Sequence, residues 1–275
     1  MHRVLFSCLA LAASVTLPAC GGGQLPDKSG SVNVLDIIAD LQNPVGSASH
    51  AVTAGFSDTS ATGGRTSCEV SEEGDCSLQI CPRSSGGVPD GALRTAGAIR
   101  VASATKQVTL KPGADRRYAT VSDPGAFWAG EDMITIEADG GDLPAFSAQV
   151  RAPRAVDVSA PDFAGGSTIQ IARSQDLPVR WDGSFDGKVL AMLAYDVEAT
   201  DEVVSLSCVW DPAAGQGVMP ASLLGRMPSE VNGFASVDVL HDETVDAGGF
   251  HVIVGAQTSA TAGTRSAIAP FLLVE

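Results

Sequence analysis

Short alternations of apolar and polar residues, each ended by a glycine, proline or aspartate turn, run through this chain of 275 residues. Residues 133–137 place two isoleucines on one face, and residues 189–195 place four apolar side chains on one face of a longer run. Side chains two residues apart share a face of a strand, so each run predicts a half-buried strand. Strands separated by turns every 8–12 residues or so are typical of β-sandwiches and barrels. The pattern therefore predicts an all-β fold.

Two stretches depart from this alternation. Residues 220–225 begin with proline and end with glycine, which is typical of one short helical turn. Residues 34–41 have an apolar spacing that suits either a short helix or the entry into the first strand, and we favour the strand. Both stretches are brief, so the prediction for the whole chain is unchanged.

The strand rhythm breaks at residues 151–162, where two prolines interrupt it before it restarts. We place a domain boundary near residue 155 and predict two antiparallel β-sandwich domains, over residues 32–154 and 155–275. About seven short strands in the second domain fit an immunoglobulin-like sandwich. The cysteine–tryptophan–cysteine spacing of antibody domains is missing, because Cys208 is the only cysteine in that half.

The chain begins with an apolar run behind a positive charge at Arg3, with no acidic residue as far as position 17. Such a run is typical of a secretory signal peptide and is shorter than the about 20 residues that span a bilayer. It ends in Leu17-Pro18-Ala19-Cys20, which resembles a bacterial lipobox. The resemblance implies that residues 1–19 are a lipoprotein signal peptide and that the Cys20 sulfur receives a diacylglycerol. An ordinary signal peptide that contains Cys20 is the alternative.

The residues after Cys20 predict how such an anchor would hold the protein. Residues 21–31 are rich in glycine and serine and lack apolar periodicity, so residues 20–31 are expected to be the lipidated cysteine and a flexible tether. Gly21 is not the aspartate that retains enteric lipoproteins at the inner membrane. The lipobox resemblance therefore implies a cell-envelope protein at the outer membrane, whose membrane contact is the Cys20 lipid.

The charge of the chain limits its partners. It has 17 Lys and Arg against 32 Asp and Glu, which gives a formal net charge of −15. A protein this acidic repels phosphate backbones and anionic lipid headgroups, so we do not expect nucleic acid as a partner. The lipid, and not the surface charge, would have to hold the protein at a membrane.

Four cysteines follow Cys20 in the sequence: Cys68, Cys76, Cys81 and Cys208. An envelope compartment is oxidising, so disulfides are expected, and four cysteines allow three connectivities. We expect one bridge inside the cluster, with Cys68 as a member because it lies across the turn at residues 71–75 from Cys76. The third cysteine of the cluster either bridges to Cys208, or both stay as buried thiols. The cluster lacks the closely spaced cysteine pair of zinc sites, which disfavours a metal.

The sequence contains no recognisable catalytic constellation. It has no Gly-x-Ser-x-Gly elbow, no phosphate loop and no dinucleotide fingerprint. His50 and His251 fall within strand patterns and are expected to be ordinary strand residues. A metal at residues 241–246 with His251, or at Asp182 and Asp186, is the weaker alternative to solvated turns. We therefore expect no enzyme activity, no cofactor and no resident metal.

Three tryptophans are candidates for a ligand-stacking surface. Trp181 and Trp210 occur within apolar alternations, which favours the core. Trp128 lies between two turns next to Phe127. We select Phe127 and Trp128 as the candidate contact surface.

Several stretches resemble a group of secreted lipoproteins that is common in myxobacteria and their relatives. They are residues 130–131, 143–147, 177–181, 206–208 and 219–224. The resemblance covers most of the chain after the signal peptide and lies mainly in turn and core residues. It implies a β-rich fold and an envelope location, and it carries over no catalytic residues.

Together these observations predict a lipid-anchored envelope protein built from β-sandwiches. We expect it to act as a non-enzymatic binding or adhesion module, with a glycan or an envelope protein as its ligand. The alternative is a structural or assembly partner of other envelope proteins, and an enzyme of unknown class is a third, weaker alternative.

Overall fold

The computed structural model describes residues 27–37, 49–60, 68–82, 92–164, 167–197, 200–228, 232–263 and 265–275. Most of these residues are in β-strands, very few are helical, and antiparallel pairs predominate, so the predicted all-β sandwich fold is confirmed. The helical turn predicted at 220–225 is the short helix α2 (Ala221–Leu224), which follows a 3₁₀ turn, η3 (Pro212–Ala214). No helix in these ranges is long and apolar enough to cross a membrane. The predicted signal peptide, with Cys20, lies outside the described residues.

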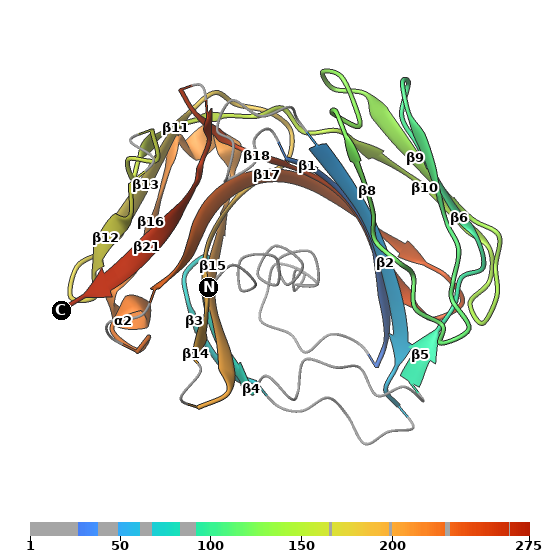
Figure 1. Ribbon diagram of the computed structural model, residues 1–275, viewed down its shortest axis with the longest axis horizontal. Helices are drawn as coiled ribbons and strands as arrows, with labels where there is room; N and C mark the ends of the chain where they lie inside the picture. Colours follow the sequence, from blue (N-terminus) through green and yellow to red (C-terminus); the bar gives the residue numbers. More distant parts are fainter. Residues whose placement is uncertain are drawn as a thin grey trace.

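The strands form three sheets (Figure 1). The 12-stranded sheet contains β1 (Lys28–Ile37), β2 (Ser49–Asp58), β3 (Glu69–Glu73), β4 (Cys76–Pro82), β5 (Leu93–Arg94), β8 (Val121–Pro124), β12 (Ile169–Ala172), β14 (Lys188–Val197), β15 (Glu202–Trp210), β17 (Asn232–Asp246), β18 (His251–Ser259) and β21 (Ile268–Val274). The four-stranded sheet contains β6 (Ile99–Ala102), β7 (Gln107–Leu110), β9 (Met133–Ala138) and β10 (Phe146–Arg151). The five-stranded sheet contains β11 (Asp157–Ala160), β13 (Leu177–Asp182), β16 (Gln216–Met219), β19 (Thr261–Ala262) and β20 (Arg265–Ser266).

The 12-stranded sheet bends into an arch, and each of the two smaller sheets covers the outer side of one arm (Figure 1). Its main strand order is β3-β4-β15-β14-β17-β18-β1-β2-β5. The sheet is mixed, because β1 pairs parallel to β18 and β12 pairs parallel to β21. A parallel pair joins segments far apart in the sequence, which local alternation does not predict.

Two hydrophobic cores lie between the arch and its outer sheets. Core 1 joins β4, β14, β15 and β17 to the five-stranded sheet, with Leu193, Leu206 and Val237 fully buried in it. Core 2 joins β1, β2 and β18 to the four-stranded sheet, with Val34 and Val254 fully buried. Burying a side chain of this size contributes roughly 1.5–3 kcal/mol. The two cores therefore hold the outer sheets onto one common sheet.

The expected boundary near residue 155 marks where the chain passes from core 2, at Ala152, to core 1, at Val156. It does not separate the two cores completely. Residues 76–82 pair with β15 and supply Leu78 to core 1, while residues 245–256 supply side chains to core 2. Each core thus draws strands from both halves of the chain, because the long strands of the arch continue past both outer sheets.

The predicted tether at residues 20–31 extends too far. Residues 28–31 belong to β1, which pairs with β2 on one side and with β18 on the other. Ser29 and Ser31 are buried, and a side chain at Gly30 would collide with the ring of Phe56. Small residues at positions 29–31 therefore allow close packing inside the sheet, and they do not form a flexible linker. Any flexible tether therefore ends by residue 27.

Candidate functional site

The four cysteines after Cys20 form two disulfides, Cys68–Cys81 and Cys76–Cys208. The predicted bridge within the cluster is present and contains Cys68, but its partner is Cys81 and not the nearer Cys76. In the β3–β4 hairpin, Glu69 lies opposite Ile80, so Cys68 is next to Cys81. Of the two alternatives left open for the remaining pair, the structure shows the bridge to Cys208, which lies directly opposite Cys76 in the β4–β15 pair.

The Cys76–Cys208 bridge fixes the tip of the β3–β4 hairpin beside the end of β15. Residues 72–75 form this tip, and their acidic side chains are exposed. The bridge itself is buried, with both cysteines in core 1. It therefore anchors an exposed, negatively charged turn to a rigid base.

A hollow of about 550 Å³ opens between this hairpin tip and the strand β16. It is lined by Glu73, Gly74, Asp75, Val209, Trp210, Asp211, Ala214, Gln216, Gly217, Val218 and Pro220. Three of these residues are acids and none is a lysine or an arginine. We name it the hairpin hollow, and its electrostatic character is anionic.

The buried Trp210 is one of the residues that line the hairpin hollow. Its ring stacks on Trp181 at 5.8 Å between centroids, and Trp181 Nε1 donates a hydrogen bond to Pro212 O at 2.9 Å. A side chain at Gly217 would collide with the Trp210 ring, so only glycine allows β16 to pack against it. Both tryptophans are buried, as their alternation in the sequence predicted. Trp210 therefore shapes the hollow without offering a free aromatic face.

Two acids of the hairpin hollow are held by hydrogen bonds. The Asp211 carboxylate caps η3 by accepting from Ala213 N at 2.8 Å. The Glu73 carboxylate accepts from the Ser222 hydroxyl of α2. A carboxylate has about four acceptor positions, so each of them retains capacity for a cation.

A second polar group, Asp36, His50 and Lys106, lies at the edge of core 2, with Asp36 and His50 buried and Lys106 half-exposed. Asp36 and His50 face each other across β1 and β2, on the side of the sheet that carries Val34 and Val52. Asp36 accepts from Phe127 N at 2.7 Å, and His50 Nδ1 lies 2.7 Å from Gly125 O. That short contact is a hydrogen bond only if Nδ1 carries the proton. The Lys106 ammonium donates to Pro124 O at 2.9 Å and to Gly125 O at 3.1 Å.

These three side chains bind the backbone of residues 124–128, and their hydrogen bonds within the described ranges include none to a serine or threonine hydroxyl. His50 contacts Gly125, Lys106 and the ring of Phe127, and its Nε2 has no hydrogen-bond partner among the described residues. Burial raises the pKa of Asp36, although the backbone N–H groups of Phe127 and Trp128 oppose the shift. The group is therefore a device that holds a loop in the core, and it lacks the arrangement of an acyl-transfer site.

The prediction that Phe127 and Trp128 form an exposed contact surface is wrong. Phe127 is 0% exposed and Trp128 is 8% exposed, and both belong to core 2. The hydrogen bond from Phe127 N to Asp36 pulls the segment inward, and the Phe127 ring packs edge-on against His50. Turn residues on both sides suggested exposure, but the buried acceptor on β1 is 91 positions away in the sequence.

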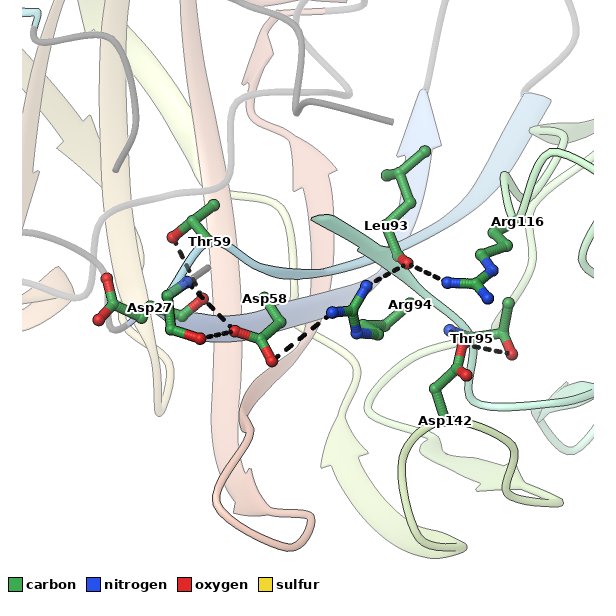
Figure 2. A network of polar contacts seen from close by, with 9 residues as sticks. Asp27, Asp58, Thr59, Leu93, Arg94, Thr95, Arg116 and Asp142 are labelled. Carbon is green, nitrogen blue, oxygen red and sulfur yellow. Dashed lines mark hydrogen bonds and ion pairs between the residues drawn. The ribbon is translucent and has the colours of Figure 1, made fainter. Parts of the chain in front are cut away.

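A surface network ties the start of β1 to the end of β2 and to β5 (Figure 2). Thr59 N donates to Asp27 O at 2.8 Å, and Arg94 lies 3.8 Å from the Asp58 carboxylate. Arg116 and Arg94 both donate to Leu93 O. The hydroxyl of Ser60 is the main cause of the lowered pKa of Asp58. Because most of these contacts end on backbone carbonyls or on neighbouring turns, the network joins strand ends.

The acidic and histidine residues weighed as metal ligands do not converge. No group of three or more His, Cys, Asp or Glu suited to a metal occurs within the described ranges. Alternation along β17 places Asp242 on the opposite face from His241 and Glu243, and Lys188 binds Asp242 at 2.7 Å. His251 pairs with Asp246 in the sheet but is exposed.

A buried acid that the sequence analysis did not select lies at the centre of the arch. Asp238 of β17 is 4% exposed, between Val237 and Val239, which both point into core 1. Its side chain therefore points to the inner face of the arch. Burial raises the pKa of Asp238 to about 6. Hydrogen bonds from Ser236, Ser259 and Gln257 favour the charged form and partly oppose this rise.

Comparison of the chain with protein-family models finds no match, and comparison with curated proteins finds none at a significant level. The class of protein that the structure defines is therefore a disulfide-bonded, all-β protein with one sheet shared between two cores. Any functional assignment must come from the chemistry of its own residues.

Sequence reasoning missed the hairpin hollow and the group at Asp36. The hollow joins residues 73–75 to residues 209–220, which no local pattern connects. Asp36 had a usable signal, because it continues the inward alternation of Val32 and Val34. A charged residue on the apolar face of a strand indicates a buried partner.

The two disulfides should differ in their contribution to stability. In the chain-entropy account, the bridge across 132 residues contributes about 5 kcal/mol and the bridge across 13 residues about 3 kcal/mol. We expect the double variant Cys76→Ser/Cys208→Ser to lose more unfolding free energy in urea than Cys68→Ser/Cys81→Ser. An equal or reversed order would contradict the role given to the long bridge.

Asp238 should make the stability of the protein depend on pH in a particular direction. Its pKa is raised in the folded state, so its stabilising contribution is complete below about pH 4 and is lost as the pH rises through about 6. Replacing Asp238 with Asn should raise the unfolding free energy at pH 8 by about 1–3 kcal/mol and have little effect at pH 4. Urea unfolding of both proteins across this range gives the difference. A gain that is constant with pH would rule out the titration of Asp238 as its cause.

Proposed function

We propose that this protein is a lipid-anchored protein of the cell envelope that acts as a non-enzymatic binding module. The observation that carries the proposal is the pairing of all four cysteines after Cys20 in two disulfides. Disulfides persist in oxidising compartments outside the cytosol, which supports export. The apolar run that ends at Leu17-Pro18-Ala19-Cys20 supplies the means of export and the anchor.

The start of β1 makes the proposed anchor short. Lys28 is the first residue of the strand, so only residues 21–27 separate Cys20 from the folded body. Fully extended, this stretch reaches at most about 25 Å. The body would therefore stay close to the membrane surface and meet ligands that lie near it. The lipobox resemblance implies that this membrane is the outer membrane.

Binding is favoured over catalysis because the titratable groups that resemble a site, in core 2 and at η3, are engaged in structure. Asp36, His50 and Lys106 bind backbone groups, and Asp211 caps η3. A protein ligand is favoured over a glycan, because Trp128, Trp181 and Trp210 are all buried and offer no free ring for a sugar. A structural role in envelope assembly is the alternative.

The anchor is tested at Cys20. In cells fed an alkyne analogue of palmitate, the wild-type protein should be labelled and should sediment with membranes. Cys20→Ala should lose the label and leave the membrane fraction, because no thiol remains to receive the diacylglycerol. Cys8→Ala is the matched control, since it removes a cysteine from the predicted signal peptide and should keep the label. Equal labelling of wild type and Cys20→Ala would overturn the anchor.

The ligand class is tested with the purified protein and with intact cells. Because the three tryptophans are buried, we expect no binding on a glycan array, and cross-linking on cells should trap a protein partner. A partner present in fixed stoichiometry would favour the assembly role over the binding role. Saturable glycan binding would contradict the preference for a protein ligand.

A further inference from the structure

The strand β16 ends the five-stranded sheet and borders the hairpin hollow. Within the described strands, β16 pairs with β13 on one side only. In an antiparallel pair, alternate residues direct their N–H and C=O groups away from the partner, so a terminal strand presents backbone groups to an added strand. On β16, Val218 O lies 3.5 Å from Cys76 Sγ of the β3–β4 hairpin, and the edge has no strand partner among the described residues. Gln216, Gly217 and Val218 of this strand line the hollow. An extended peptide adds to such an edge through main-chain hydrogen bonds.

The side chains around this edge favour a ligand with basic and apolar residues. Val218 is 47% exposed, and Val209 and Pro220 extend the apolar lining beside it. Glu73, Asp75 and Asp211 supply three negative charges, in a lining without any basic residue. Lysine and arginine side chains complement these carboxylates, and alternate residues of an added strand would reach the two kinds of surface.

The walls of the hollow are held before any ligand arrives. The Cys76–Cys208 bridge lies beside Asp75 on one wall and beside Trp210. Gly217 packs against Trp210, and Asp211 is fixed as the cap of η3. A site whose parts are already ordered loses less conformational entropy on binding.

We propose that the hairpin hollow binds an extended, basic segment of a partner protein, which adds as a strand to the open edge of β16 between the acids of the β3–β4 hairpin and η3. This rests on the proposed binding function and names the class of its ligand. A free cation is a poorer occupant, since no group of metal ligands gathers in the described residues.

The probe is a blocked eight-residue peptide that alternates lysine and valine, titrated by fluorescence anisotropy into the full-length protein in detergent. The test variant is Glu73→Gln/Asp75→Asn/Asp211→Asn, which removes the charges and keeps the hydrogen-bonding shapes. Asp115→Asn/Asp123→Asn/Glu137→Gln is the matched control, because it removes three exposed charges far from the hollow. We expect the test variant to weaken binding about tenfold and the control to change it less than about twofold. Equal weakening by both would show that only the net charge of the protein attracts the peptide, and would overturn the site.

Two further comparisons test the strand edge. Val218→Lys should weaken binding about tenfold by repelling the basic peptide, whereas Met133→Lys, at a residue with the same 47% exposure on β9, should not. Peptides N-methylated at alternate residues, on one edge and then on the other, lose the donors of that edge. At least one of them should bind about tenfold more weakly. Full binding by both would overturn strand addition.

The outcomes separate this inference from the proposed function. If the peptide does not bind but Cys20 is lipidated, the hollow is not the site and the anchored protein stands. If the peptide binds as expected but Cys20 carries no lipid, the site stands and the anchor fails.

Discussion

Backbone pairing at the top of the arch is the interaction on which the rest of the structure depends. β17 pairs with β18, and β18 pairs with β1, so hydrogen bonds run without interruption from the strands of core 1 to those of core 2. A single strand serves both cores, because Val237 of β17 lies in core 1 and Val245 packs against core 2. Among the described strands, the two outer sheets do not pair with each other, and each is placed by the part of the arch that it covers.

The positions and inward faces of single strands in this chain follow closely from its sequence, but the way in which the strands pair does not. Alternation predicted β9 and β14 with their inward faces, because the period of a strand depends only on neighbouring residues. The same reasoning assigned residues 28–31 to a tether. Whether Gly30 is flexible or closely packed depends on Phe56, which reaches it only through the register of β1 and β2. The shared sheet also escaped prediction, since β1 and β18 are more than 200 positions apart.

The same distinction holds for the sites. Oxidising conditions and cysteine count predicted disulfides, but the choice between Cys76 and Cys81 as partner of Cys68 required the hairpin register. Phe127 is buried because Asp36 accepts its N–H, and Asp36 comes from a distant strand. The acids of the hairpin hollow belong to two separate turns, the β3–β4 hairpin and the start of η3. In each case the missing information was a contact between segments distant in sequence. Local secondary-structure propensity does not predict such contacts.

The long disulfide also changes what a single peptide-bond break does to this molecule. Cys76 and Cys208 lie on either side of β6 to β14, so a cut anywhere between them leaves the two pieces covalently joined. A protein held at a surface by its N-terminus would therefore keep its C-terminal half after one proteolytic event in that span. Shedding would need a second cut, a cut outside the loop, or a reductant with access to a buried sulfur pair.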